Sequence, residues 1–332
     1  MMIYLSNFLS KNNDVTFYTF KFDSELFSDL TFKVQDFKKS KLISFFKIVY
    51  ELRKYDYVFI WNSPMHFAAV FSKIFFNSKA KLIWWHHHYP WYYSSNANVY
   101  IKFKSFLEKL LIKEIDLFIS NSKYLQDVLK DIYKRDSKIL YPVLGDKFLN
   151  HNRKEFLSNT SNIIFTYGRW VEGKNLKLVF KVYDDLKNKI PNLVLKIWWT
   201  WNQIQKYKDK FIKDKNIHLL WDLNTNQIIN NLEQSNIFLF SSLIDSFWLV
   251  IIESMSIWVP VISFNKSWAK EIIENWVNWF LVDSDKEFIE KTYEVLNNTS
   301  LRNNLSNNSL NTLEKFWEKS FKKSLEEIFN TL

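Results

Sequence analysis

Two basic side chains flank a turn that the sequence predicts to join a strand to a helix. Arg169 and Lys174 stand in the segment YGRWVEGKN, residues 167–175. A guanidinium presents a planar fork of donors to phosphate oxygens, and an ammonium adds a compact point charge. The pair therefore predicts a phosphate-binding turn, although an Arg and a Lys without further context are more often part of a solvated surface.

Two acidic side chains bracket the start of a predicted helix further along the chain. Asp245 precedes this helix and Glu253 lies within its first turns. Between them, Phe247, Trp248 and Leu249 form the helix start. Because backbone N–H groups at a helix start bind phosphate well, we expect an anion here. Capping of the helix is the alternative role for such an acidic pair.

Three consecutive histidines, residues 86–88, follow the predicted strand AKLIWW. Ligands gather at the carboxyl ends of strands in parallel sheets, and His86 lies nearest to the strand end. A zinc site is a weaker hypothesis, because neighbouring side chains on an extended chain alternate in direction and no further ligand set is evident. A polar loop cluster without a chemical role is the other alternative.

The composition excludes several classes of protein. The chain has 332 residues and is 47% hydrophobic, which is enough for two domains. It has no cysteine, so disulfides, thiolate nucleophiles and cysteine metal sites are excluded. We find no apolar run long enough to span a membrane and no signal peptide. These features favour a cytoplasmic protein.

The net charge of +10 is unevenly distributed. Residues 1–150 hold 22 Lys and Arg and 14 Asp and Glu, whereas the remainder holds 23 and 21. A basic first half favours an anionic partner, such as a membrane surface or a phosphorylated acceptor. Codon bias of an AT-rich genome is the alternative explanation. Nucleic acid is not an expected partner, because the basic–aromatic motifs of known nucleic-acid-binding modules are absent.

Strand-like and helix-like segments alternate in both halves, which predicts an α/β fold with two doubly wound parallel sheets. The predicted strands cover residues 14–20, 55–61, 80–85, 116–122 and 138–143, then 162–169, 193–198, 216–221, 236–242, 260–264 and 278–283. The predicted helices cover residues 101–115, 124–133, 176–190, 226–235, 249–257 and 269–275, with a long amphipathic pattern over 284–332. The division is predicted at residue 147, within a polar linker over 144–160, and residues 311–332 form a helix that could cross back to the first domain.

The beginning of the sequence is unusual for such a domain. Residues 3–11 have a helical pattern, whereas a doubly wound domain should start with a strand and a tight glycine turn. We therefore expect the first strand and turn of residues 1–147 to be missing from this chain. A domain that starts with a helix is the alternative.

Tryptophan occupies places where the pattern predicts glycine. The chain has 3 glycines and 15 tryptophans. Trp258 stands between a predicted helix and the strand PVISF, where a helix end calls for a residue at positive φ. Two Asn-Trp pairs, ending at Trp276 and Trp279, stand where Asn-Gly would mark a turn. Trp199 and Trp201 stand between a strand and a helix, where small residues admit a ligand.

When these tryptophans are read as glycine, residues 236–283 resemble the donor domain of retaining glycosyltransferases of the GT-B fold, family four. The motif GRxxxxKN at residues 168–175, the strand end LKIWWTW and the segment VPVISF carry the same resemblance. Eight tryptophans fall on glycine positions of the family, namely Trp199, Trp201, Trp221, Trp248, Trp258, Trp268, Trp276 and Trp279. Translation of UGA as tryptophan, in a gene from a lineage that reads it as glycine, would explain them. A tryptophan-rich protein is the alternative.

The resemblance implies two Rossmann-like domains facing a cleft, with the acceptor bound by residues 1–147 and the donor by residues 148–310. It implies that Arg169 and Lys174 bind the donor diphosphate and that Glu253 binds the ribose hydroxyls. Asp245, where the family usually has Glu, would contact the transferred sugar, and His86 would face it. The resemblance further assigns donor binding to residues 247–249, to Trp199 and to Gly168.

The implied reaction moves a sugar from a nucleotide-diphosphate sugar to a glycan or lipid-linked acceptor, with retention at the anomeric carbon. It needs no cofactor and no metal ion, because the two basic side chains supply the positive charge. Peripheral attachment to the inner face of the membrane is compatible with the basic first half. A non-catalytic binding or scaffold protein of the same fold is the alternative.

Overall fold

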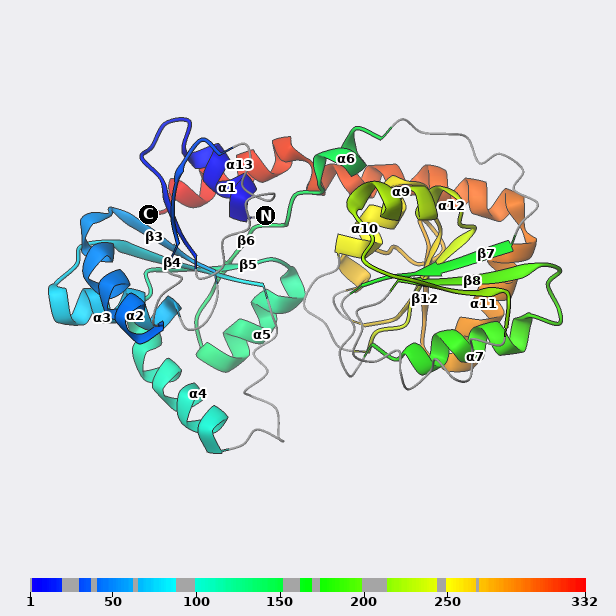
Figure 1. Ribbon diagram of the computed structural model, residues 1–332, viewed down its shortest axis with the longest axis horizontal. Helices are drawn as coiled ribbons and strands as arrows, with labels where there is room; N and C mark the ends of the chain where they lie inside the picture. Colours follow the sequence, from blue (N-terminus) through cyan, green and yellow to red (C-terminus); the bar gives the residue numbers. More distant parts are fainter. Residues whose placement is uncertain are drawn as a thin grey trace. The chain divides into compact units, whose positions relative to one another are not determined.

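The computed structural model describes most of the chain and divides it into two compact units. The described residues are 2–19, 30–36, 41–61, 65–87, 99–151, 162–168, 174–198, 214–243, 249–266 and 269–332. The N-terminal unit comprises residues 1–121, 125–142 and 325–332, and the C-terminal unit comprises residues 122–124 and 143–324. Figure 1 shows the elements of each unit.

The N-terminal unit contains a four-stranded parallel sheet in the order β3-β4-β5-β6. Its strands are β3 Tyr57–Ile60, β4 Lys81–His86, β5 Leu117–Ser120 and β6 Lys138–Ile139. The connecting helices are α3 Met65–Phe76, α4 Val99–Leu111 and α5 Lys123–Tyr133. Because the strands follow one another in sequence and crossovers are right-handed, these helices cover the same face, as Figure 1 shows.

Further elements of the N-terminal unit precede this sheet. Helix α1 Met2–Leu9 leads into a small parallel pair, β1 Thr16–Thr19 and β2 Lys33–Asp36, and α2 Lys41–Glu51 follows. The sequence patterns predicted α1 and β1. They did not predict β2, α2 or α3, which the structure shows. Among the described residues, the chain thus enters this unit through a helix.

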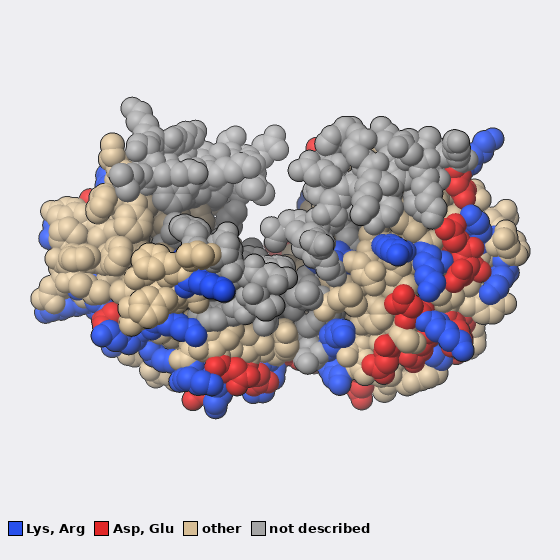
Figure 2. Space-filling view, turned by 90° about the horizontal axis from the view of Figure 1, so that it is seen from below, with Lys and Arg blue, Asp and Glu red and all other residues tan. Residues whose placement is uncertain are grey.

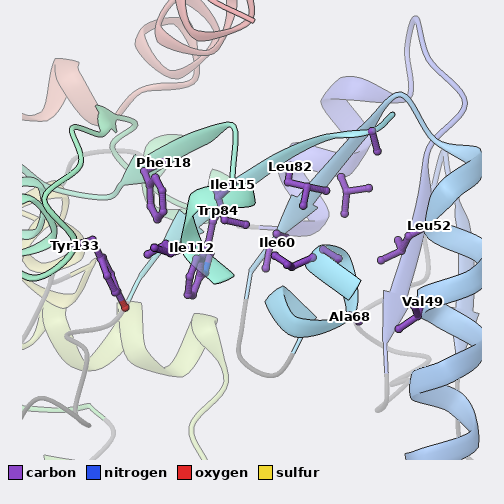
Figure 3. Packing of buried hydrophobic residues seen from close by; sticks show 14 of the residues in the cluster. Val49, Leu52, Ile60, Ala68, Leu82, Trp84, Ile112, Ile115, Phe118 and Tyr133 are labelled. Carbon is purple, nitrogen blue, oxygen red and sulfur yellow. The ribbon is translucent and has the colours of Figure 1, made fainter. Parts of the chain in front are cut away.

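The core of the N-terminal unit lies between its sheet and the helices α2 to α5 (Figure 3). Trp84 on β4 and Phe118 on β5 are almost fully buried, and Tyr133 at the end of α5 packs beside them. Aliphatic side chains such as Ile60 and Leu82 continue the core toward α2. Burial of this apolar area contributes the main stabilising free energy of the unit.

The C-terminal unit contains a six-stranded parallel sheet in the order β12-β11-β10-β7-β8-β9. Its strands are β7 Asn162–Thr166, β8 Leu193–Trp198, β9 Ile217–Leu220, β10 Ile237–Phe240, β11 Val261–Phe264 and β12 Phe280–Val282. Its helices are α6 Asp146–Leu149, α7 Leu176–Leu186, α9 Thr225–Glu233, α10 Leu249–Ser256, α11 Asp285–Asn297 and α12 Thr299–Leu313. All residues of β10, β11 and β12 are buried, as expected of parallel strands covered on both faces.

The predicted α/β class with two Rossmann-like parallel sheets is confirmed. The long amphipathic pattern over 284–332 is divided into three helices, and the last of them lies within the predicted C-terminal helix over 311–332. Asn298 caps the start of α12 by accepting a hydrogen bond from the Leu301 N–H at 2.9 Å, and a short 3-10 turn over 314–316 separates α12 from α13 Glu318–Phe329. The short helix predicted over 269–275 is a 3-10 turn at Ala269–Glu271.

Helix α13 runs from the C-terminal unit into the N-terminal unit, because the division of the chain falls between residues 324 and 325. Phe329 packs its ring against Tyr57 and Phe59 of β3, with ring centroids 5.7 and 5.8 Å apart. The N-terminal unit is therefore completed by a segment that follows the entire C-terminal unit in sequence. Apart from residues 122–124, the chain first passes into the C-terminal unit between residues 142 and 143, five residues before the predicted boundary at 147.

Trp258 has the conformation that the sequence predicts for glycine. Its φ is 67°, in the left-handed region. Its N–H donates to the Met255 carbonyl at 3.0 Å, and the N–H of Val259 donates to the Ser254 carbonyl at 3.0 Å. This pair of hydrogen bonds is the Schellman motif, in which the left-handed residue is usually glycine. A side chain at this φ costs about 1 kcal/mol.

The other tryptophans divide into distinct cases. Trp276 has a φ of 68° and an indole that is 57% exposed. Trp279 lies outside the positive-φ region, and its indole is completely buried, so the predicted turn conformation is wrong there. Trp221 also lies outside that region. The remaining four positions, Trp199, Trp201, Trp248 and Trp268, lie outside the described residues.

Candidate active site

The strand order of the C-terminal unit reverses at β7. The chain proceeds from β7 outward through β8 to β9, then returns to place β10 on the opposite side of β7. In open α/β sheets, ligands bind outside the carboxyl ends of the strands at such a reversal. The residues that follow β7 and β10 are therefore the candidate site of this unit.

A hydrogen bond joins the two sides of the reversal. Tyr167, the first residue after β7, donates its hydroxyl to Oε2 of Glu253 at 2.6 Å. Glu253 is on α10, the helix that follows β10, and Tyr167 is only 4% exposed. The distance is short because the acceptor is a carboxylate. The bond fixes the position of the acid that the sequence predicts to bind ribose hydroxyls.

The surroundings shift the ionisation of both partners. Burial raises the pKa of Glu253 to about 6, and the hydrogen bond from Tyr167 opposes this shift by stabilising the carboxylate. Burial, together with the nearby Glu253 charge, raises the pKa of Tyr167 well above its usual value, so this side chain remains a donor. Glu253 is then a carboxylate above about pH 6, able to accept two hydroxyl hydrogens.

Replacing Tyr167 by phenylalanine is expected to move the acidic limit of activity to higher pH. Loss of the hydroxyl removes the interaction that lowers the pKa of Glu253, so more of this acid is protonated at a given pH. The measurement is the pH profile of kcat/KM with the nucleotide sugar, which should rise through about pH 6 in the parent protein. Tyr183→Phe, a change on α7, removes a comparable hydrogen bond to Asp214 and should leave the midpoint unchanged. An unchanged midpoint in Tyr167→Phe would contradict the role of Glu253.

Lys174 approaches the same edge of the sheet from the turn before α7. Its carbonyl accepts a hydrogen bond of 2.8 Å from the hydroxyl of Ser241, the first residue after β10. Its ammonium lies 6.0 Å from the centroid of the Phe240 ring. The next residue, Asn175, has a left-handed conformation that starts α7. Lys174 is thus held against the end of β10.

Gly168 follows Tyr167 and leaves the backbone open to a ligand. Its φ is 149°, a conformation that residues with a side chain rarely adopt. A Cβ placed on it would meet no atom within 4 Å. Glycine is therefore required here by conformation rather than by crowding, and the free space admits close approach of a phosphate or sugar.

Four of the sequence-predicted residues lie at the ends of β7 and β10 or on the elements next to them: Gly168 after β7, Lys174 before α7, and Leu249 and Glu253 on α10. The other predicted residues of this unit, Arg169, Trp199, Asp245, Phe247 and Trp248, lie outside the described residues. Sequence reasoning missed Tyr167 and Ser241. Both lie among the last residues of predicted strands, and Tyr167 directly precedes Gly-Arg, which was the available signal.

His86 belongs to the N-terminal unit, where it is the last residue of β4. Its side chain is 6% exposed and lies among the rings of Trp84, Phe118 and Tyr133. His87 points to the opposite face of the strand, beside Trp61 and Trp85, and is partly exposed. His88 lies outside the described residues. Within the described part of the chain, no group of three or more acidic or histidine side chains could hold a metal ion.

Comparison with known proteins agrees with this geometry. Residues 148–312 match the family model of Glycosyl transferases group 1. This segment is therefore similar to a glycosyltransferase domain. The capsular polysaccharide biosynthesis glycosyltransferase CapM of Staphylococcus aureus is 26% identical over 181 residues, which cover 53% of this chain and 47% of CapM. The chain thus spans about half the length of this relative.

Solved glycosyltransferase structures share the fold over nearly the whole chain. Anabaena Alr3699/HepE in complex with UDP and glucose has a TM-score of 0.80 at 16% identity, covering 99% of this chain and 95% of that protein. A glycosyltransferase from Rickettsia africae has a TM-score of 0.77 at 17% identity, covering 98% and 92%. The chain therefore has the GT-B fold that the sequence predicted. No helix within the described residues is long and apolar enough to cross a membrane.

Proposed function

We propose that the protein is a glycosyltransferase that moves a sugar from a nucleotide-diphosphate sugar to a hydroxyl acceptor. The observation that carries this proposal is the Tyr167–Glu253 pair at the strand reversal, within the segment that matches the glycosyltransferase family. A partly buried carboxylate held by a buried donor suits the two hydroxyls of a ribose. The lysine and the open glycine backbone beside it suit a diphosphate.

The proposed roles follow the resemblance found in the sequence. Arg169 and Lys174 bind the diphosphate and stabilise the charge of the leaving group. Glu253 binds ribose, and Asp245 contacts the transferred sugar. Gly168, Trp199 and the helix start at 247–249 complete the donor site. His86 would contact the transferred sugar only with the edge of its ring, because its side chain is almost fully buried.

The proposed reaction retains configuration. The acceptor oxygen forms a bond to the anomeric carbon on the face from which the nucleotide leaves, and the bond from that carbon to the diphosphate oxygen breaks. The acceptor proton passes to the leaving phosphate oxygen. The protein provides no nucleophile in this scheme, and its basic side chains carry the charge stabilisation without a metal ion or other cofactor.

The proposed acceptor is a glycan or lipid-linked glycan, and the proposed location is the cytoplasm with attachment to the inner membrane face. The relation to CapM, a capsular polysaccharide biosynthesis enzyme, supports a cell-surface glycan as product. UDP-sugars are the first donors to test, because UDP occupies the HepE structure. Release of UDP and transfer of label to an acceptor extract measure the activity. Binding of donors without turnover of any would favour the non-catalytic scaffold.

We further propose that glycine occupies positions 258 and 276 in the natural protein, as an alternative reading of UGA would produce. The left-handed φ values at both positions support this proposal. The complete Schellman motif at Trp258 adds to it, because glycine is the usual residue there. Peptide mass spectrometry of the protein from its native source decides the matter. A tryptophan mass at both positions would overturn the proposal.

Replacing Trp258 by glycine is expected to raise the free energy of unfolding by about 1 kcal/mol, because glycine adopts the left-handed conformation without steric cost. Denaturant unfolding followed by circular dichroism measures the change. Lys187→Gly is the matched control, because Lys187 caps the end of α7 with a φ of −58°. It should lower the free energy of unfolding by a comparable amount. If Trp258→Gly and Lys187→Gly lowered the free energy of unfolding equally, the left-handed conformation of residue 258 would not explain the effect of glycine there.

A further inference from the structure

Helix α4 exposes a row of large apolar side chains and buries an acidic one. Val99, Phe103, Phe106 and Leu110 are between 51% and 85% exposed, whereas Glu108 is completely buried. A surface helix of a globular protein normally shows the reverse arrangement. The exposed residues follow the spacing i, i+4, i+7, i+11, so they form one continuous stripe along the helix.

Contacts in the core maintain this orientation. The Glu108 carboxylate lies 3.3 Å from Nε2 of His66 on α3 and accepts a hydrogen bond from the hydroxyl of Tyr133 on α5. The His66 ring stacks on Trp84, with centroids 4.4 Å apart. Rotating α4 to bury its phenylalanines would break these buried interactions and leave His66 and the Tyr133 hydroxyl without the carboxylate. The apolar stripe is therefore held outward by the fold.

Exposed lysines lie beside this apolar stripe. Lys102, Lys109 and Lys113 are exposed and occupy the same helical face and its continuation into the following turn. The only acidic residue in the sequence of α4 is the buried Glu108. In the left part of Figure 2, which views the N-terminal unit from the side where α4 lies in Figure 1, Lys and Arg atoms border an area of other atoms. The surface thus combines apolar rings with positive charge.

A second exposed apolar area lies on the neighbouring helices. Ile43, Phe46 and Tyr50 on α2 are 73%, 63% and 43% exposed, at the spacing i, i+3, i+7. Phe75 and Phe76 end α3 and are 70% and 43% exposed. The rings of Tyr50 and Phe76 lie 5.5 Å apart, which joins the two helices in one surface.

We propose that α4, together with α2 and the end of α3, forms a docking surface for an anionic lipid membrane. Exposed phenylalanines enter the boundary between headgroups and acyl chains, while the lysines meet anionic headgroups, which is the chemistry of interfacial helices. Charge complementarity selects this occupant over a second copy of the chain, because two such faces would bring lysines against lysines. The proposal specifies the membrane partner of the proposed function, and its test does not depend on sugar transfer.

Flotation of the full chain with lipid vesicles tests the proposal. The parent protein should bind vesicles containing 30 to 40 mol% phosphatidylglycerol, on the order of what interfacial helices require, and bind pure phosphatidylcholine weakly. Phe103→Ser/Phe106→Ser should lower binding to the anionic vesicles at least about tenfold. Lys102→Glu/Lys113→Glu should lower it in a salt-dependent way. Tyr293→Ser/Trp317→Ser, on exposed aromatic residues of the C-terminal unit, is the control and should bind like the parent.

Three outcomes would overturn the proposal. The parent protein could fail to bind anionic vesicles, or the phenylalanine variant could bind them as well as the parent does. Alternatively, sedimentation velocity could show a dimer that dissociates in that variant, which would assign the surface to a second copy. Circular dichroism confirms that the variants are folded, and transfer to a water-soluble acceptor reports separately on the glycosyltransferase proposal.

Discussion

Replacing Glu253 by alanine is expected to lower kcat/KM for the nucleotide sugar about a hundredfold. The change removes the proposed hydrogen bonds to the ribose, and a hydrogen bond to a charged group contributes about 1.5–3 kcal/mol. It also leaves the Tyr167 hydroxyl buried without its carboxylate acceptor, which adds to the loss. Steady-state kinetics over a range of donor concentrations measures the effect.

The control for this change is Glu290→Ala, which removes an exposed acid from α11. It should leave kcat/KM within about twofold of the parent value, because surface substitutions away from such features change little. Glu253→Gln is informative beside it, because glutamine keeps the shape but accepts at one oxygen only. Full activity of both Glu253 variants would exclude this residue from the donor site.

Replacing Lys174 by alanine is expected to lower kcat by a factor on the order of 10²–10³, the range for removal of one group that stabilises developing charge. The ammonium is proposed to neutralise the leaving diphosphate, so the loss should be larger in kcat than in binding of the nucleoside diphosphate product. Rapid-mixing kinetics and calorimetric titration with UDP separate the two effects. The backbone contact from Ser241 uses the carbonyl of Lys174 and survives the change.

Lys286→Ala is the corresponding control, since this ammonium group is on α11 and its side chain is 86% exposed. It should leave both kcat and UDP affinity unchanged. If Lys174→Ala weakens UDP affinity and kcat/KM but leaves kcat intact, the lysine contributes uniform binding rather than charge stabilisation in the transition state.

The sequence predicted the C-terminal unit more completely than the N-terminal unit, for a physical reason. Strands such as β10 and β12 are buried on both faces, so they are uninterrupted apolar runs that can be recognised without knowledge of their neighbours. Helix α4 was also visible as a periodic pattern. Its orientation could not be predicted, because it depends on the contact of Glu108 with His66 on another helix.

The candidate site, too, could be predicted only in part from the sequence. The sequence alone identified Lys174 and Glu253 as candidate site residues, and it placed Gly168 at a predicted turn. The bond from Tyr167 to Glu253 joins residues 86 positions apart, and only the strand order brings them together. Trp258 is the opposite case, because a helix end followed by proline demands a left-handed residue whatever its neighbours are.

The crossing of α13 has a consequence for synthesis of the protein. The ring of Phe329 covers Tyr57 and Phe59, yet the ribosome makes residues 325–332 only after the complete C-terminal unit. The N-terminal unit, which is synthesised first, is thus completed last. Until residues 325–332 have been made, Phe329 cannot pack against β3. Nascent chains of this protein expose an apolar strand until late in translation, and a premature stop before residue 325 would damage the opposite end of the sequence.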